Sequence, residues 1–143
     1  MSHWRTASEG NILIRVYVIH VPEDYAFFDR LVEQARTAKL AVEFDRMQAK
    51  QPWVPAWKQQ CWNRIYKCDG SITLLSKNTN SGGIKWELEC AHKFQAPMLG
   101  IHLDKAKSAN VPDELQGSSV IDWNWPEIAR FIRELDQSST ASA

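Results

Sequence analysis

The sequence has no excess charge of either sign. It contains 17 Lys and Arg residues and 17 Asp and Glu residues in a total of 143, so the formal net charge at pH 7 is zero. Nucleic acids and anionic membrane surfaces attract proteins with a basic excess. We therefore expect neither of them as a partner.

Long apolar runs are also missing. No stretch approaches the roughly 18 consecutive apolar residues that a membrane-spanning helix needs. The first residues show no basic segment followed by an apolar one, as a secretory signal would. We expect a cytoplasmic protein that neither crosses a membrane nor is secreted.

Sequence motifs for metals and cofactors are absent as well. The three cysteines, Cys61, Cys68 and Cys90, are widely spaced and form no C-x-x-C or Cys/His zinc pattern, and neither His92 nor His102 completes a ligand set with them. No G-x-G-x-x-G or P-loop motif occurs. We expect reduced thiols, no metal site and no bound cofactor.

The sequence does contain a regular alternation of two kinds of segment. Apolar segments rich in β-branched residues predict strands at 12–21, 41–47, 71–76, 97–103 and 119–122. Apolar residues at helical spacing predict helices at 22–39, 56–66, 84–94 and around 128–135. Such alternation is typical of βαβ crossovers and of a doubly wound sheet.

The predicted fold is a single α/β domain over residues 11–136, between disordered ends at 1–10 and 137–143. We expect a flavodoxin-like sheet of about five mainly parallel strands, with helices on both faces. Ligands of such sheets bind outside the carboxyl ends of the strands.

Glu87 is the most informative position in the sequence. At 100° per residue it falls on the same side of its helix as Ile84, Ala91 and Phe94, where a carboxylate is out of place. Glu89 falls on the opposite, charged side and serves as the ordinary counterpart. A carboxylate on an apolar side is desolvated and either catalytic or paired with a cation from a loop, and both alternatives stay open at this point.

Several segments together resemble the TIR-like family, which includes the ThsB proteins of Thoeris antiphage defence. They are VYVIHVPED after the first strand, CDGSITLLSKNT at the third, SGGIKWELECA and PMLGIHL. The most specific piece is the run Trp86-Glu87-Leu88, which opens a helix after a polar loop. The resemblance covers nearly the whole chain and implies a TIR-like version of the predicted fold.

The resemblance implies an NAD⁺ glycohydrolase or ADP-ribosyl cyclase, with Glu87 as its catalytic residue and NAD⁺ as its substrate. A carboxylate can stabilise the oxocarbenium character that develops when the nicotinamide–ribose bond breaks. The product would be a cyclic ADP-ribose signal that acts on a partner effector in antiphage defence. Many TIR enzymes carry a tryptophan four residues before the glutamate, where this chain has Gly83, and Trp86 is the candidate substitute.

The segment 45–57 corresponds to the BB loop of TIR domains, which borders the NAD⁺ pocket and joins neighbouring protomers. This correspondence predicts a homo-oligomer formed through the segment. It also makes Trp53 a candidate pocket residue, with core packing as the alternative.

Further candidate substrate contacts lie where the strands end. His20 follows the first strand, whereas Ser76, Asn78 and Ser81 follow the third. Their side chains suit hydrogen bonds to ribose or phosphate, and the same residue types also cap helices and turns. Ser81 is the predicted N-cap of the helix that carries Glu87.

Two other functions fit the same residues. One is a non-enzymatic TIR-like adaptor, in which Glu87 pairs with a loop cation. The other is a nucleoside deoxyribosyltransferase-like enzyme that uses Glu87 as a nucleophile on a glycosidic bond.

Overall fold

The computed structural model describes residues 13–79, 82–103 and 111–141. Its five strands are β1 (Ile14–Ile19), β2 (Val42–Asp45), β3 (Gly70–Leu75), β4 (Met98–His102) and β5 (Ser119–Asp122). Its four α-helices are α1 (Tyr25–Thr37), α2 (Pro55–Tyr66), α3 (Gly82–Phe94) and α4 (Trp125–Ala141), with short 3₁₀ turns η1 (Pro22–Asp24) and η2 (Asp113–Leu115).

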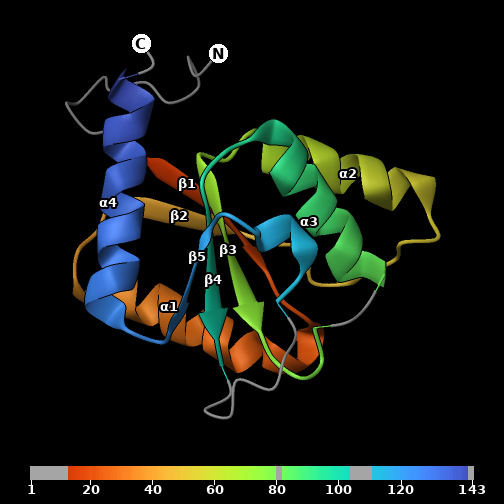
Figure 1. Ribbon diagram of the computed structural model, residues 1–143, viewed down its shortest axis with the longest axis horizontal. Helices are drawn as coiled ribbons and strands as arrows, with labels where there is room; N and C mark the ends of the chain where they lie inside the picture. Colours follow the sequence, from red (N-terminus) through yellow and green to blue (C-terminus); the bar gives the residue numbers. More distant parts are fainter. Residues whose placement is uncertain (1–12, 80–81, 104–110, 142–143) are drawn as a thin grey trace.

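The strands form one parallel sheet in the order β2-β1-β3-β4-β5. The helices cover both faces, α1 and α4 on one side and α2 and α3 on the other (Figure 1). This arrangement confirms the predicted doubly wound fold. The strand order reverses between β1 and β3, and a ligand site is expected beyond the carboxyl ends of these two strands.

The local sequence explains where the elements begin and end. β1 and β3 are almost wholly buried because apolar side chains point to both faces. Pro22 opens the turn that precedes α1, where its missing N–H is not needed. Lys39 and Gln95 follow α1 and α3 with φ values of 58° and 59°, the left-handed conformation that ends many helices.

Two apolar clusters fill the space between the sheet and its helices. The cluster under α1 and α4 consists of aliphatic side chains and Phe28. The cluster under α2 and α3 contains Tyr17, Trp57, Cys61 and Cys90 among its apolar side chains. Glu87 is buried on this second side of the sheet.

The two chain ends differ from each other in the structure. The predicted disordered N-terminus, 1–10, lies outside the described residues. At the other end, α4 continues into the predicted tail as far as Ala141. No helix in the described ranges is both long and apolar enough to cross a membrane.

Candidate functional site

Three segments of the chain meet at the carboxylate of Glu87. Glu87 lies in α3 and its side chain is fully buried. Tyr17 of β1 donates a hydrogen bond from its hydroxyl to Oε2. Lys50, between β2 and α2, places Nζ 2.9 Å from Oε1 and 3.0 Å from Oε2. The sequence left a catalytic and a paired Glu87 as alternatives, and the structure shows the pair with a loop cation.

The surroundings of Glu87 set its proton affinity. Burial raises the pKa of Glu87 above its ordinary value, while Lys50 and the Tyr17 hydroxyl work against this rise. Burial and the adjacent carboxylate raise the pKa of Tyr17 in turn, so its hydroxyl stays protonated and remains a donor. A carboxylate with a raised pKa is a better nucleophile and proton acceptor than an exposed one.

Lys50 is held in place by the segment on which it lies. Its Nζ also donates to the carbonyl of Met47 at 2.8 Å. The carbonyl of Ala49 accepts a hydrogen bond of 2.6 Å from the indole nitrogen of Trp57 in α2. Gly83 of α3 also lies against Lys50, and a Cβ added at Gly83 would meet the Cβ of Lys50 at only 2.7 Å. Gly83 is therefore the residue that leaves room for Lys50 over Glu87.

The thiols near Glu87 are chemically quiet. Cys61 and Cys90 are buried, and burial together with the charge of Glu87 raises the pKa of each to about 12. Both remain protonated at neutral pH and behave as small apolar side chains. All three cysteines of the chain are free.

His20 lies at the end of β1, as predicted, but it contacts other residues than Glu87. Its ring packs against Phe28 of α1. Nδ1 lies 2.7 Å from the Val21 carbonyl and Nε2 lies 3.3 Å from Nη1 of Arg46. A carbonyl only accepts and a guanidinium only donates, so Nδ1 carries the proton and Nε2 accepts. Burial, together with Lys50 and Arg46, lowers the pKa of His20 to about 4.

The predicted polar residues after β3 bind the protein itself. The Ser76 hydroxyl donates to Asp24 at 2.7 Å, and the backbone N–H of Ser76 donates to the Thr79 hydroxyl at 2.7 Å. The backbone N–H of Asn78 donates to the Ser76 hydroxyl, whereas the Asn78 side chain is exposed. These contacts tie the turn after β1 to the turn after β3. Ser81 lies outside the described residues.

The two predicted tryptophans lie in different surroundings. Trp53 is 75% exposed, so it fills neither the core nor a closed pocket. Trp86 is half-buried against α2, where its indole nitrogen donates to the Lys58 carbonyl at 3.1 Å and the Lys58 ammonium lies over its ring. Trp86 therefore packs between α3 and α2, and its part in binding a substrate stays a prediction. The exposed Glu89 pairs with Lys85, as its position predicted.

Two pockets lie near the carboxyl end and the edge of β2. One, of about 400 Å³, is lined by Phe28, Phe44, Asp45, Arg46, Met47, Gln48 and Arg64. Among the residues that the structure places, Arg46 forms no ion pair, and its guanidinium lies 4.1 Å from the centre of the Phe28 ring. This leaves a cation available beside a cavity at the edge where ligands are expected.

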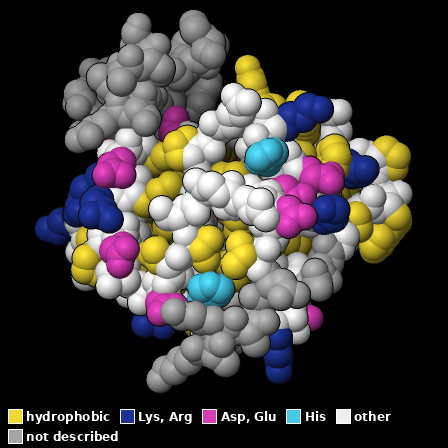
Figure 2. Space-filling model, in the orientation of Figure 1, with side chains coloured by type: hydrophobic (Ala, Val, Ile, Leu, Met, Phe, Trp, Pro, Cys, Tyr) yellow, Lys and Arg dark blue, Asp and Glu magenta, His cyan; other side chains and the backbone are white. Residues whose placement is uncertain are grey.

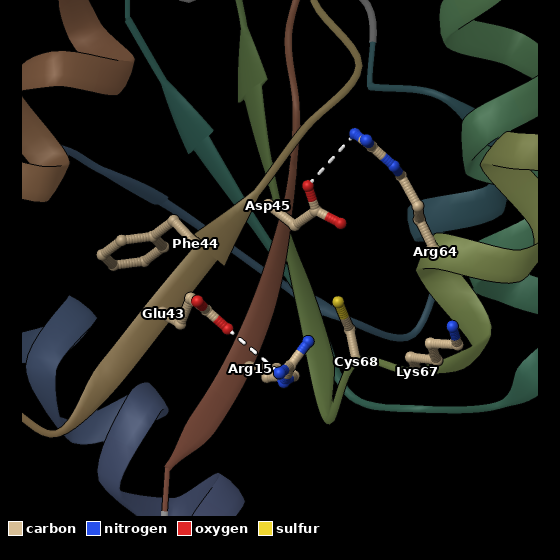
Figure 3. A pocket seen from close by; sticks show the side chains of 7 residues that line it. All are labelled: Arg15, Glu43, Phe44, Asp45, Arg64, Lys67 and Cys68. Carbon is tan, nitrogen blue, oxygen red and sulfur yellow. Dashed lines mark hydrogen bonds and ion pairs between the residues drawn. The ribbon is translucent and has the colours of Figure 1, made fainter. Parts of the chain in front are cut away.

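The other pocket, of about 310 Å³, lies on the α2 side of β2 (Figure 3). Most of its charges are already paired, Arg15 with Glu43 at 3.4 Å and Arg64 with Asp45 at 3.3 Å. Burial and nearby carboxylates raise the pKa of Cys68 in its wall to about 12. On the face shown in Figure 2, acidic and basic side chains are intermixed, so no surface of one sign forms there.

Sequence reasoning missed Tyr17 and Lys50. Tyr17 lies in an apolar strand, where a tyrosine is indistinguishable from an ordinary core residue. Lys50 lies in a polar segment between strand and helix, where a lysine suggests a solvated side chain. The one available signal was Glu87 itself, because a carboxylate on an apolar side requires partners. No group of three or more His, Cys, Asp or Glu side chains is arranged to hold a metal in the described part of the chain.

Comparison with known proteins reveals similarity in structure only. No protein-family model matches the chain, and no curated protein matches its sequence. Solved structures share its fold, among them the three that follow. A 2-deoxyribosyltransferase from Bacillus psychrosaccharolyticus has a TM-score of 0.57 at 12% identity, over 80% of this chain and 89% of that one.

The other two structures are similar over even more of their length. A conserved protein from Enterococcus faecalis V583 has a TM-score of 0.61 at 14% identity, over 88% of this chain and 99% of that one. The CMP N-glycosidase BcmB from Clostridium botulinum has a TM-score of 0.52 at 14% identity, over 85% and 98%.

These findings correct the resemblance drawn from the sequence. The identification as a TIR-like, Thoeris-type protein is wrong, because the structural neighbours are a deoxyribosyltransferase and an N-glycosidase. The run Trp86-Glu87-Leu88 was a poor guide, since its tryptophan is used to pack α3 against α2. The expectation of cyclic ADP-ribose signalling in immunity falls with that identification. What the chain shares with its neighbours is the doubly wound α/β fold.

Proposed function

We propose that the chain is an enzyme that cleaves the N-glycosidic bond of a nucleoside or nucleotide, with Glu87 as the nucleophile. The observation that carries this proposal is the carboxylate of Glu87, buried in α3 and held by Tyr17 and Lys50. Two proteins that share the fold are named as a 2-deoxyribosyltransferase and a CMP N-glycosidase, and both names describe chemistry at this type of bond. This function is one of the alternatives that the sequence itself allows.

The proposed reaction has two steps. A Glu87 oxygen attacks C1′ of the sugar as the C1′–N bond breaks, and the bonding electrons leave with the base, which takes up a proton. The glycosyl ester on Glu87 then reacts with water, giving the free sugar, or with a second base, giving a new nucleoside. Carboxylates act as covalent nucleophiles in this way in glycosidases.

Tyr17 has a defined part in this scheme. Its hydroxyl stays protonated and binds Oε2, which fixes the plane of the carboxylate and leaves Oε1 as the attacking atom. Holding a nucleophile in one orientation lowers the entropic part of the barrier. Tyr17 is thus a positioning residue for Glu87.

Arg46 favours a substrate that carries a phosphate. It has no carboxylate partner among the described residues, and it lines the cavity of about 400 Å³ together with Arg64 and Gln48. Guanidinium groups bind phosphate through two parallel hydrogen bonds. NAD⁺ also contains an N-glycosidic bond and phosphates, so it belongs among the substrates to be tested.

The deciding experiment measures release of free base by chromatography from a panel of ribonucleosides, deoxyribonucleosides, their 5′-monophosphates and NAD⁺. We expect Glu87→Gln to lower the rate about 1,000-fold or more, since the amide is a poor nucleophile. Glu89→Gln, two residues away and exposed, is the matched control and should keep the rate. A 2-fluoro sugar substrate should leave a stable glycosyl group on Glu87, detected by peptide mass spectrometry.

Two outcomes of the base-release assay would contradict the proposal. If Glu87→Gln releases base as fast as the unchanged protein, or if no member of the panel is cleaved, the chain is not a glycosidase of this kind. Self-association through residues 45–57 and an effector partner stay predictions that this experiment does not address.

A further inference from the structure

The cover over Glu87 is the feature that the proposed chemistry does not explain. Both carboxylate oxygens are occupied, Oε2 by Tyr17 and both by Lys50 at 2.9 and 3.0 Å. The Glu87 side chain has no exposed surface. Nucleophilic attack brings the reacting atoms to about 3 Å, and the Lys50 ammonium lies at this distance from both oxygens.

We infer that Lys50 is a removable cover on Glu87, and that residues 46–54 must move off the carboxylate before a substrate can reach it. We name residues 46–54 the covering segment. The inference rests on the proposed function in one respect only, namely that Glu87 is the nucleophile and that the substrate must reach its carboxylate.

The covering segment is lightly held. It has no helix or strand. Met47 is buried and the side chain of Lys50 is only 9% exposed, whereas Gln48, Ala49, Gln51 and Trp53 are exposed. Segments with few buried apolar contacts open at lower free energy than the core that they cover. The side-chain contacts that hold its middle are the Lys50 ammonium and the Trp57 indole, which donates to the Ala49 carbonyl.

The elements beneath the covering segment are rigid by contrast. Tyr17 lies in a central strand with no exposed surface, and Glu87 lies in a 13-residue helix that packs on the sheet. When the covering segment moves, the carboxylate and its tyrosine stay where they are. The site is thus assembled before opening, and the motion exposes it without building it.

Gly83 shows how closely the cover fits. An added Cβ at Gly83 would lie 2.7 Å from the Cβ of Lys50, closer than real side chains approach one another. An added Cβ at Gly82, the adjacent residue, would meet Pro52 of the same segment at 3.4 Å, which is ordinary contact. Alanine at position 83 therefore pushes the covering segment away, whereas alanine at position 82 does not.

Carboxyl footprinting tests the cover without requiring any activity. A carbodiimide and glycine ethyl ester modify accessible carboxyl groups, and trypsin then releases one peptide, residues 86–93, that contains both Glu87 and Glu89. Fragment mass spectrometry gives the labelling rate of each residue. Glu89 is exposed in α3 and serves as the internal reference.

We expect Glu87 of the unchanged protein to be labelled at least tenfold more slowly than Glu89. Gly83→Ala should raise the Glu87 rate at least tenfold and leave Glu89 unchanged, while Gly82→Ala should leave both rates unchanged. Lys50→Ala should raise the Glu87 rate as well, and circular dichroism verifies that each variant is folded. The inference is wrong if Glu87 is labelled as fast as Glu89 at the outset, or if Gly83→Ala and Lys50→Ala label no faster than the unchanged protein.

Failure of the cover and failure of the glycosidase are separate results. If base release depends on Glu87 but Gly83→Ala does not change the labelling of Glu87, the glycosidase proposal stands and the proposal of a cover is wrong. If Gly83→Ala raises the labelling of Glu87 but the chain cleaves no N-glycoside, the proposal of a cover stands and the glycosidase proposal is wrong.

Discussion

The two faces of the sheet are built differently. Under α1 and α4 the buried side chains of the strands and helices are aliphatic or aromatic, among them Val18, Leu31, Ile72 and Ile132. Under α2 and α3 the same strands bury polar groups, with Ser71 and Thr73 of β3 beside Tyr17 of β1, and Glu87 above them. The α1/α4 face therefore contributes mainly to the stability of the fold. The α2/α3 face contributes less, because it buries the polar groups that hold a carboxylate in place.

The candidate site lies on the α2/α3 side of the sheet. A buried charge requires partners, and each partner removes apolar area from the core. On the α1/α4 face the buried side chains are apolar and come from both helices and from β1, β3 and β4. A change on that face should therefore alter stability without altering activity.

The largest expected effect comes from a cavity on the α1/α4 face. Ile132→Ala removes a fully buried side chain and should lower the free energy of unfolding by about 3 kcal/mol. Base release per folded molecule should stay within about twofold, because Ile132 lies on the other side of the sheet from Glu87. Urea unfolding gives the first quantity and the chromatographic assay the second.

The matched variant is Leu88→Ala on α3, next to Glu87 and equally buried. It should lower stability by a similar amount and also lower base release. If Ile132→Ala lowers base release as much as Leu88→Ala does, the division between the two faces does not hold.

A smaller effect is expected from His20, on the α1 side of the sheet edge. Its pKa falls from 6.5 to about 4 in the folded protein, so the unfolded chain takes up a proton first as the pH falls. The resulting stability is complete above pH 6.5 and is lost progressively as the pH falls from 6.5 through 4. The loss amounts to about 2 kcal/mol, after allowance for solvent near the ring.

Urea unfolding at pH 7 and at pH 4.5 measures this loss. His20→Asn keeps a donor toward the Val21 carbonyl and removes the titrating ring, so its stability should change less between the two pH values. His92→Asn, exposed on α3, should behave as the unchanged protein does. An equal pH dependence in all three proteins would refute the assignment.

The smallest expected effect concerns the polar α2/α3 face. The Thr73 hydroxyl is buried and has no hydrogen-bond partner within the described ranges. Thr73→Val keeps the shape and removes the unpaired hydroxyl, and should raise the free energy of unfolding by about 1 kcal/mol. Ser76→Ala, whose hydroxyl donates to Asp24, should lower it by a similar amount. A fall in stability for Thr73→Val would show that its hydroxyl has a partner after all.

The order of the elements could be predicted because each strand carries its own signal. The segment 12–21 is apolar on both faces, and β1 occupies its centre, Ile14–Ile19. Pro22 and Pro55 mark helix starts by chemistry that depends on no distant residue. The fold class follows from this local information alone.

The candidate site could be predicted only in part. Glu87 was identified because its helical position conflicts with its charge. Tyr17 lies 70 residues away in the sequence and Lys50 lies 37 away, and neither conflicts with its own surroundings. Contacts that bring together residues so far apart are set by the packing of α3 on the sheet, which no local pattern records. The family assignment failed for a related reason, since a short run around a helix start does not identify a family by itself.

Gly83 links two parts of the chain that must change together. A residue with a side chain at position 83 has room only if position 50 is glycine or if the backbone there shifts, because the close approach is to the Cβ of Lys50. Among chains of this fold, a side chain at the position of Gly83 should therefore accompany an uncovered glutamate, and glycine there should accompany a preceding loop packed as closely on the helix as it is here. The absence of a Cβ at this one position would then distinguish chains in which a loop covers the carboxylate from chains in which the carboxylate is accessible.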